Sequence, residues 1–444
     1  MCDDPDVNDR PSPSLGEALR VWVYVALNSF GGPAGQLAVM HRELVERRRW
    51  VAEKRFLHAL NFSMLLPGPE AHQLAVYIGW LLHGVRGGLV AGTLFVLPGV
   101  VAIMALSILY AGFQDTTFVQ ALFYGIKPAV IAVVGVATTA LARRALGGRL
   151  TAAIALGAFV AIFFFEILFP LVIAAAALLG LLGHRFGGTA IATDPAAPAN
   201  GSRRPALRGS LAVLVVGLGL WLGPVAILLA ALGPTDILTQ LGGFFAGAAV
   251  VTFGGAYAVL TFVGQQAVEA YGWLTASQML DGLGMAESTP GPLIMVVQFV
   301  GFMAAFGQPD GLQPMAAGFV AGMLVSWVTF VPSFLWIFLG APYAELLREK
   351  RQLTAALNAI TAAVVGVIAN LALWFALQTL FAVTGEVRVG PLRLPTVDAA
   401  SLDPIALALV VAAWSALVRL RWPLLLTLAA SAGLGFVAYL ATAG

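Results

Sequence analysis

Long apolar stretches recur along the whole 444-residue chain and limit what it can fold into. They include residues 89–111, 129–142, 211–232, 315–339 and 355–375. Several reach the length of about 20 residues that an α-helix needs to cross the roughly 30 Å hydrocarbon core of a membrane. Only 10% of the chain is charged, whereas soluble domains carry about 25% charged residues. The sequence therefore predicts an all-α integral membrane protein.

The amino terminus and the motif content exclude several other classes. Residues 1–14 are rich in aspartate and proline and lack the basic flank and apolar core of a cleaved signal peptide, so we expect an acidic cytoplasmic tail. Cys2 is the only cysteine, which excludes an internal disulfide framework and a thiolate metal cluster. The chain also lacks a nucleotide-binding glycine loop, a zinc-protease motif and a hydrolase serine elbow. We therefore expect no enzyme, no cofactor, no metal and no nucleic-acid partner.

A repeat at a constant offset divides the chain into two halves. The sequence Ser-Phe-Gly-Gly at residues 29–32 corresponds to Thr-Phe-Gly-Gly at residues 252–255, and Pro-Gly-Pro at 67–69 recurs at 290–292. Both pairs are 223 residues apart (252 − 29 and 290 − 67), and a fixed period of this kind indicates structural repetition. We expect a first repeat over residues 15–183, a cytoplasmic linker over 184–210, an unpaired transmembrane helix over 211–232 and a second repeat over 238–441.

Positive charge predicts that the two repeats have inverted topology, because cytoplasmic loops are enriched in Lys and Arg. Residues 42–55 carry six basic side chains and their counterparts at 264–278 carry none. The bias is reversed at residues 113–118, which have no basic side chain, and at their counterparts 346–352, which have three. If every loop obeys the rule, the broken segments 17–40 and 56–83 are re-entrant hairpins; single kinked spans are the alternative. No role is predicted for the loop at residues 384–403.

Glycine and proline interrupt the apolar segments at four corresponding places. Such breaks persist in a membrane only where protein or a water-filled cavity covers the freed backbone groups. In transporters with inverted repeats, broken-helix ends near the midplane form the substrate site. The alternative is that these small residues only support close helix packing. We expect the four repeated motifs to mark an interior binding site.

The same motifs resemble those of the chromate ion transporter family in its two-domain form. The resemblance spans nearly the whole chain and rests on residues 29–33, 66–79, 252–257, 265–266 and 287–293. It implies a multi-pass protein of the bacterial inner membrane that exports chromate and confers resistance to it, with sulfate as a competitor. Membrane lipid is then a partner, and a homodimer stays open. Composition and spacing do not indicate chromate in particular.

A tetrahedral dianion would be held by backbone N–H groups at helix N-termini and by hydroxyl, amide and ammonium donors. Glycine would let the backbone approach the ligand closely. For Ser29 and Thr252, capping of a helix end is almost as good an explanation, and both roles can coexist. The predicted substrate-binding residues are Ser29, Gly31, Gly32, Asn61, Pro67, Gly68, Gln73, Lys127, Thr252, Gly254, Gly255, Ser288, Thr289 and Gly291.

Four ionisable residues lie in or beside apolar segments. Lys127 lies within the apolar run 118–142, where an ionised side chain costs at least about 2.5–3.5 kcal/mol near the bilayer centre. An anion would offset that cost, and snorkelling to the interface is the alternative. Glu70, Glu287 and His72 lie next to the Pro-Gly-Pro turns and are candidates for proton coupling. A favourable helix N-terminus for Glu70 and an ordinary hydrogen bond for His72 are the alternatives.

Without a nucleotide-binding motif, transport is expected to be secondary or passive. An interior-negative membrane potential favours the export of a dianion and opposes its uptake. We therefore expect chromate export driven by the membrane potential, a proton gradient or both. A transporter of sulfate or another oxyanion and a passive anion channel lined by broken helices are the alternatives.

Overall fold

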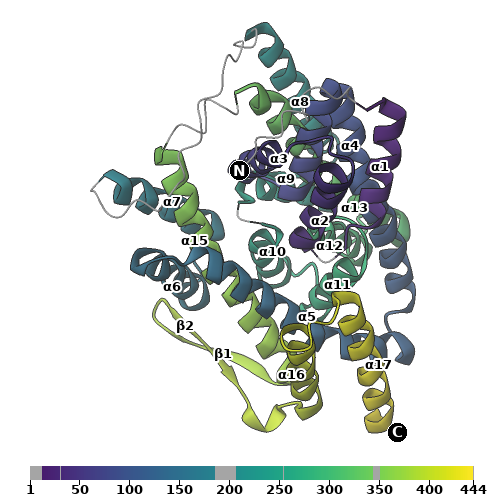
Figure 1. The fold of residues 1–444 in the computed structure, drawn as a ribbon. Helices are drawn as coiled ribbons and strands as arrows, with labels where there is room; N and C mark the ends of the chain where they lie inside the picture. The colour runs from purple at the N-terminus through teal and green to yellow at the C-terminus, as the bar shows by residue number, and fades with distance from the viewer. Residues whose placement is uncertain (1–12, 31, 186–206, 254, 344–350, 444) are drawn as a thin grey trace. The chain divides into compact units, whose positions relative to one another are not determined.

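The structure is a computed structural model that describes residues 13–30, 32–185, 207–253, 255–343 and 351–443. Nearly all of these residues are helical (Figure 1). Six of the described helices are long and apolar enough to cross a membrane. They are α4 (Glu70–Phe113), α5 (Thr117–Ala145), α8 (Leu207–Leu232), α13 (Pro314–Gly340), α15 (Arg351–Leu380) and α17 (Leu424–Ala443). The prediction of an all-α membrane protein is confirmed.

Shorter helices fill the rest of the described chain. Five are apolar and between 12 and 17 residues long: α6 (Arg149–Phe165), α7 (Phe169–Arg185), α9 (Ile237–Val251), α12 (Val296–Gly307) and α16 (Pro404–Val418). Five more flank the predicted breaks: α1 (Leu15–Leu27), α2 (Gly32–His41), α3 (Glu53–Leu65), α10 (Ala256–Gln265) and α11 (Ala276–Ser288). The apolar segments are therefore interrupted at all four places where the sequence predicts a break.

One β-hairpin lies in the region for which the sequence predicts only a loop. Strands β1 (Thr384–Val389) and β2 (Leu392–Val397) pair antiparallel, with Val389 opposite Leu392 at the turn. Gly390, at φ +60°, opens the two-residue turn, a position that favours glycine in tight hairpins. Figure 1 shows the hairpin beside α6, which β2 contacts.

The chain divides into two compact units. The first comprises Met1–Ser107, Ala197–Ala256 and Thr289–Glu349, and the second comprises Ile108–Ala196, Tyr257–Ser288 and Lys350–Gly444. In the first unit, α13 packs against α8, α9 and α12; in the second, α5 packs against α11, α15, α16 and α17. Each unit therefore contains segments from both halves of the sequence.

The same local structure occurs twice, 223 residues apart. After α2 the chain makes a π-helical turn, η2 (Arg42–Arg47), and after α10 it makes another, η3 (Gln266–Ala270). Three residues after each turn ends, a tryptophan donates its backbone N–H to a carbonyl in the turn. These bonds are Trp50 N–H to Leu44 O at 2.8 Å and Trp273 N–H to Ala267 O at 2.7 Å. The correspondence between the halves therefore extends from sequence to backbone hydrogen bonding.

Helix α4 leaves helical geometry at His83 and Gly84, where Gly84 has φ +61°. The bend coincides with the end of the broken segment predicted over residues 56–83. Some predicted segments fall partly outside the described residues: positions 1–12 of the acidic tail, 186–206 of the linker and 344–350, which include two basic residues used in the charge argument.

Candidate functional site

Two helix breaks of the first unit exchange backbone hydrogen bonds with two breaks from the other half of the sequence. The N–H of Gly68 donates to the carbonyl oxygen of Thr252 at 2.8 Å, and the N–H of Gly291 donates to that of Ser29 at 3.0 Å. Both pairs join a Pro-Gly-Pro turn of one half to the glycine motif of the other. These bonds satisfy backbone groups that the broken helices leave free inside the membrane.

Gly68 and Gly291 occupy conformations that only glycine adopts readily, with φ +134° and +114°. A Cβ atom on Gly68 would lie 2.5 Å from Nε2 of Gln73, and one on Gly291 would lie 3.0 Å from Cα of Gly99. At Gly68 and Gly291 the absence of a Cβ therefore permits close approach of other parts of the protein itself, and close approach of a ligand stays a prediction.

The hydroxyl groups of Ser29 and Thr252 are engaged with their own helices. Ser29 Oγ donates to Val25 O at 2.6 Å, and Thr252 Oγ1 donates to Ala248 O at 2.7 Å. Both residues are buried. In this conformation the two hydroxyl protons hold the ends of α1 and α9, which matches the capping alternative more closely than ligand donation does.

Buried amide and hydroxyl groups surround the Pro67–Gly68 turn. Gln73 Nε2 donates to Pro67 O at 2.7 Å, while Gln73 Oε1 and Ser333 Oγ have no hydrogen-bond partner in the described part of the chain. A Cβ on Gly68 would lie 3.0 Å from Ser333 Oγ. Ser333 was not predicted, although it directly follows Pro332, as Gly99 directly follows Pro98 in the first half. A proline at a similar place in each half was the available signal.

The remaining predicted residues of the first unit have different environments. His72 is fully buried, with its ring edge-on to Phe330 and Phe334 at centroid distances of 5.2 and 5.1 Å. Asn61 is exposed on α3, and Glu70 begins α4 and is partly exposed. Gly32 begins α2 with φ +66°, Gly255 precedes α10 with φ +100°, and Thr289 is partly exposed. Gly31 and Gly254 lie outside the described residues.

Lys127 belongs to the second unit, where it meets two residues of α11. Its Nζ donates to Ser277 Oγ at 2.5 Å and lies 3.4 Å from Oδ1 of Asp281. The other carboxylate oxygen of Asp281 accepts from the hydroxyl of Tyr110 at 2.8 Å. The Asp281 side chain is only 6% exposed and that of Lys127 is 22% exposed. Asp281 was missed by sequence reasoning, although a lone aspartate within an apolar helix was the available signal.

Lys127 and Asp281 line a cavity of about 440 Å³. The other lining side chains are mostly polar and come from α4, α5, α11, α15, α16 and α17 or from the turn before α5. They include Gln114, Asp115, Gln120, Tyr124, Gln378, Thr379 and Tyr439. Lys127 is the one basic residue among the lining residues of this cavity. The cavity therefore offers a single cation, two carboxylates and several neutral hydrogen-bonding groups.

Glu287 is buried at the end of α11, in the second unit. It is 3% exposed, and its Oε1 accepts a hydrogen bond from the hydroxyl of Tyr257. Its Oε2 has no partner within the described residues. Ser288 follows it, is exposed, and donates its hydroxyl to Met285 O at 2.9 Å. Tyr257 is a further residue that sequence reasoning did not select.

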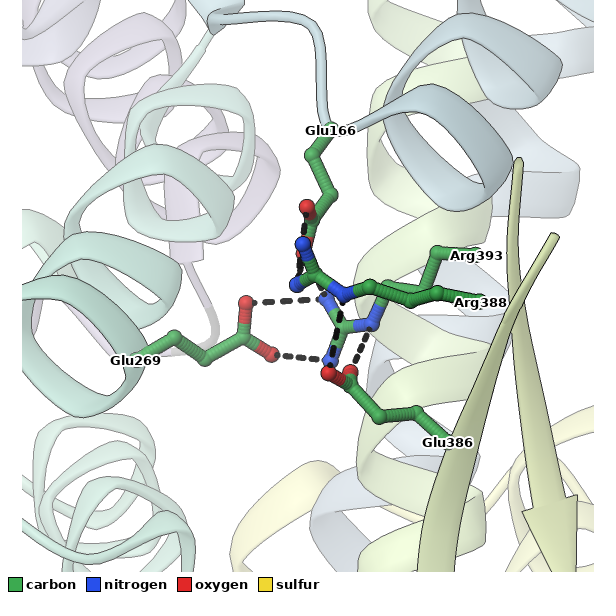
Figure 2. Close-up of polar contacts among 5 residues, drawn as sticks. All are labelled: Glu166, Glu269, Glu386, Arg388 and Arg393. Carbon is green, nitrogen blue, oxygen red and sulfur yellow. Dashed lines mark hydrogen bonds and ion pairs between the residues drawn. The ribbon is translucent and has the colours of Figure 1, made fainter. Parts of the chain in front are cut away.

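Five charged residues of the second unit form an ion-pair network (Figure 2). Arg393 of β2 pairs with Glu166 at 2.9 Å, Glu269 at 3.1 Å and Glu386 at 2.6 Å. Arg388 of β1 pairs with Glu166 and Glu386 at 3.2 and 3.1 Å. Glu166 lies between α6 and α7, and Glu269 lies in η3. The network therefore ties the hairpin to two helical elements.

The charges of the network shift the protonation of its members. Burial acts to raise the pKa of Glu386, but the guanidinium groups of Arg393 and Arg388 outweigh it, so that the pKa of Glu386 is lowered. Partial burial acts to lower the pKa of Arg393, and the bonds to Glu269 together with the charges of Glu386 and Glu166 outweigh it, so that this pKa is raised. Glu386 and Arg393 are therefore held in their charged forms.

A family model and several relatives that match this sequence are all named for chromate transport. The chromate transporter family model matches residues 16–181 and 239–436. A probable chromate transport protein of Synechococcus elongatus is 28% identical over 96% of this chain and 97% of its own. The chromate transport protein of Pseudomonas aeruginosa is 34% identical over 81% and 80%, and that of Cupriavidus metallidurans is 28% identical over 82% and 82%. No solved structure matches the chain.

Proposed function

Because this chain belongs to the chromate transporter family, we propose that it is a secondary transporter that exports chromate from the cytoplasm across the bacterial inner membrane. Relatives that carry the name chromate transport protein cover most of its length. The observation that best supports an anion substrate is Lys127, the one basic residue among those lining a polar cavity of about 440 Å³. Export of this kind would confer chromate resistance.

Lys127 and the neutral donors of the cavity suit a tetrahedral oxyanion. The ammonium group of Lys127 supplies positive charge, and the hydroxyl of Ser277 accepts a hydrogen bond from it at 2.5 Å. The amides of Gln114 and Gln378 supply further neutral donors. Neutral donors favour an anion without fixing its identity, so sulfate is expected to compete with chromate.

The helix breaks of the first unit are proposed, by themselves, as further places where an anion can bind. The N-termini of α2 and α4 follow directly after the glycine and Pro-Gly-Pro motifs, and free N–H groups of a first helical turn attract anions. Gln73 Oε1 and Ser333 Oγ add buried polar groups without partners among the described residues. We retain the predicted residues of these motifs, Gly31 and Gly254 included, as substrate-binding candidates.

Two inverted repeats are proposed as the architecture of this transporter. The recurring π-helical turns and the paired bonds of Gly68 and Gly291 support a relation between residues 15–183 and 238–441. The six basic residues at 42–55 favour a cytoplasmic position for that loop by the positive-inside rule. The acidic tail and the linker at 184–210 then lie on the same side, and residues 17–40 and 56–83 form re-entrant hairpins. Helix α8, largely exposed in the structure, would face lipid or a second copy.

The membrane potential is sufficient to drive export of a dianion. A potential of about 100 mV contributes roughly 2.3 kcal/mol per charge, hence about 4.6 kcal/mol for two charges. At about 1.4 kcal/mol per tenfold, this supports a chromate gradient of about three orders of magnitude. Uptake against the same potential would need coupled cations, which favours export.

A proton can contribute if a buried carboxyl group binds it during the cycle. Glu287, 3% exposed with one oxygen unpartnered among the described residues, suits that role, and Glu70 at the start of α4 is the second candidate. His72, packed between phenylalanine rings, is the third. Transport with unchanged pH dependence in both Glu70→Gln and Glu287→Gln would remove the two glutamates from this role.

Chromate accumulation in everted membrane vesicles tests the proposed function. The potential and the pH gradient are imposed separately, and sulfate is added as a competitor. An exporter accumulates chromate against its gradient under an interior-positive potential, saturates, and is inhibited by sulfate. Movement of sulfate without chromate would identify another oxyanion transporter. Flux that neither saturates nor exceeds equilibrium would identify a passive channel.

A further inference from the structure

Asp281 occupies the position that an oxyanion bound to Lys127 would need. Its Oδ1 faces the ammonium group at 3.4 Å, and its Oδ2 is held by the Tyr110 hydroxyl at 2.8 Å. A close charge-assisted hydrogen bond between nitrogen and oxygen is about 2.7–2.9 Å long. The distance of 3.4 Å therefore describes an ion pair in which Oδ1 receives no direct hydrogen bond from the described residues, as its lack of a hydrogen-bond partner also indicates.

The charge of the cavity opposes a dianion as long as Asp281 is ionised. The titratable lining residues include one lysine and two carboxylates. The full set of titratable groups that line the cavity is Tyr110, Asp115, Tyr124, Lys127, Asp281 and Tyr439. Tyrosine side chains carry no positive charge, and the hydroxyl groups of Tyr124 and Tyr439 donate to Asp403 at 2.7 Å and to Gln120 at 3.1 Å. The single positive charge of Lys127 does not exceed the two negative charges of the carboxylates, so no net positive charge is left to attract an anion.

Asp115 and Asp281 differ in how well water can screen their negative charge. Asp115 is exposed, so solvent screens it. The Asp281 side chain is 6% exposed, so its charge depends on Lys127 and Tyr110. If a dianion pairs with Lys127 in place of Asp281, then Asp281 is left as a buried carboxylate next to another negative charge. This strongly favours the protonated form of Asp281.

Resting on the proposed function, we propose that Asp281 takes up one proton each time an oxyanion dianion binds to Lys127 and releases it when the anion leaves. The proton comes from water and is bound at Oδ1, the oxygen that otherwise faces the ammonium group. Tyr110 keeps its hydrogen bond to Oδ2 in both states. Lys127 thus exchanges its ion pair with Asp281 for an ion pair with the substrate. Asp281 is a positioning residue, because its protonation decides when Lys127 is available to the anion.

This exchange makes proton and oxyanion move together. A dianion accompanied by one proton carries a single net negative charge, so the dependence of transport on membrane potential is half that of a free dianion. Binding also strengthens as the pH falls, by up to about tenfold per pH unit while Asp281 is ionised in the empty protein.

Calorimetry of chromate binding to the purified full-length protein tests this inference. Titrations are run in buffers with different ionisation enthalpies, in the mildly alkaline range where chromate is a dianion, so that proton uptake is obtained directly. The wild-type protein is expected to take up close to one proton per chromate. Asp281→Asn, which keeps hydrogen-bonding groups at both positions, is expected to bind chromate with no proton uptake and with an affinity independent of pH.

One control variant separates Asp281 from other buried carboxylates. Glu43→Gln removes a buried carboxylate of η2 that does not line the cavity, and it is expected to keep the proton uptake. If Asp281→Asn does not fold, Tyr110→Phe takes its place. Loss of the Tyr110 hydrogen bond favours the protonated carboxyl, so the pH range of proton uptake is expected to move upward.

The outcomes that overturn the inference differ from those that overturn the proposed function. Undiminished proton uptake by Asp281→Asn, its loss in Glu43→Gln, or an unmoved pH range in Tyr110→Phe would each exclude Asp281 as the proton site while leaving chromate binding established. A wild-type protein that binds no chromate would instead overturn the proposed function, and this inference with it.

Discussion

Gly68 donates its backbone N–H to the carbonyl oxygen of Thr252, at a distance of 2.8 Å. At the corresponding positions, 223 residues away in each case, Gly291 donates to Ser29 at 3.0 Å. The two motifs that repeat in the sequence are therefore bonded crosswise: the turn of each half closes on the break of the other. Neither half could satisfy these backbone groups alone, which explains why the first compact unit draws on both.

Alanine at Gly68 or Gly291 is expected to destabilise the protein. Both residues have positive φ values, and a Cβ atom would also lie 2.5 Å from Gln73 Nε2 or 3.0 Å from Gly99 Cα. We expect a cost of about 1–3 kcal/mol for each variant, measured as a lower midpoint of thermal unfolding in detergent. Gly247→Ala is the matched control, because Gly247 is an exposed glycine of α9 with open space around its Cα. An equal loss in the control would contradict the argument.

Replacing Lys127 by methionine is expected to stop chromate accumulation and to destabilise the fold. Asp281 would lose its cation while staying buried, and breaking a buried ion pair costs about 3–5 kcal/mol. The double variant Lys127→Met/Asp281→Asn is expected to recover most of the thermal stability but none of the transport, since the cavity then has no cation. Recovery of both properties in the double variant would show that Lys127 has only a structural role. Vesicle transport and thermal unfolding are measured side by side.

Removal of the Arg393 side chain is expected to loosen the hairpin. Arg393→Gln leaves the carboxylates of Glu166, Glu269 and Glu386 with fewer partners, whereas Arg388 is 60% exposed and contacts two of them. Exposed ion pairs contribute about 0.2–1 kcal/mol each, so three lost contacts should lower amide protection in β1 and β2 by roughly tenfold. Arg388→Gln should have a clearly smaller effect in the same hydrogen-exchange experiment. Equal effects would show that Arg393 does not organise the network.

Acid is expected to weaken the same hairpin through Glu386. Its pKa is lower in the folded protein than in the unfolded chain, so its contribution is complete above the ordinary glutamate pKa of about 4.3. The contribution is lost as the pH falls through the lowered folded value. Hydrogen exchange in residues 384–397 should therefore accelerate on acidification in the wild-type protein. The Glu386→Gln variant should show less of this acceleration, and added salt should reduce the difference.

The broken helices show which features could be predicted from the local sequence. Apolar length predicted membrane-crossing helices, and the glycine and proline motifs predicted where the helices break, because both properties depend on the residues of one segment. Family resemblance was also readable, since the motifs are linear. The partners of the breaks were not, because Gly68 and Thr252 are brought together only when segments far apart in the sequence pack.

In the second unit, most of the important contacts could not be predicted from the sequence. Lys127 was recognisable as costly in an apolar run, yet its partners Asp281 and Ser277 come from α11, and no spacing rule relates those segments. The hairpin at Thr384–Val397 was predicted only as a loop, because its strands are short, exposed and held by ion pairs to Glu166 and Glu269.

The amino-acid sequence therefore determined that the chain is a membrane protein, which family it belongs to, and where its helices are interrupted. The free energy of moving a helix into lipid depends on that helix's own side chains, so these properties are local. Tertiary structure alone decided which carboxylate faces Lys127, which carbonyl receives the N–H of Gly68, and which helices the hairpin is tied to. Each of these depends on distances between segments that only packing brings within a few ångströms.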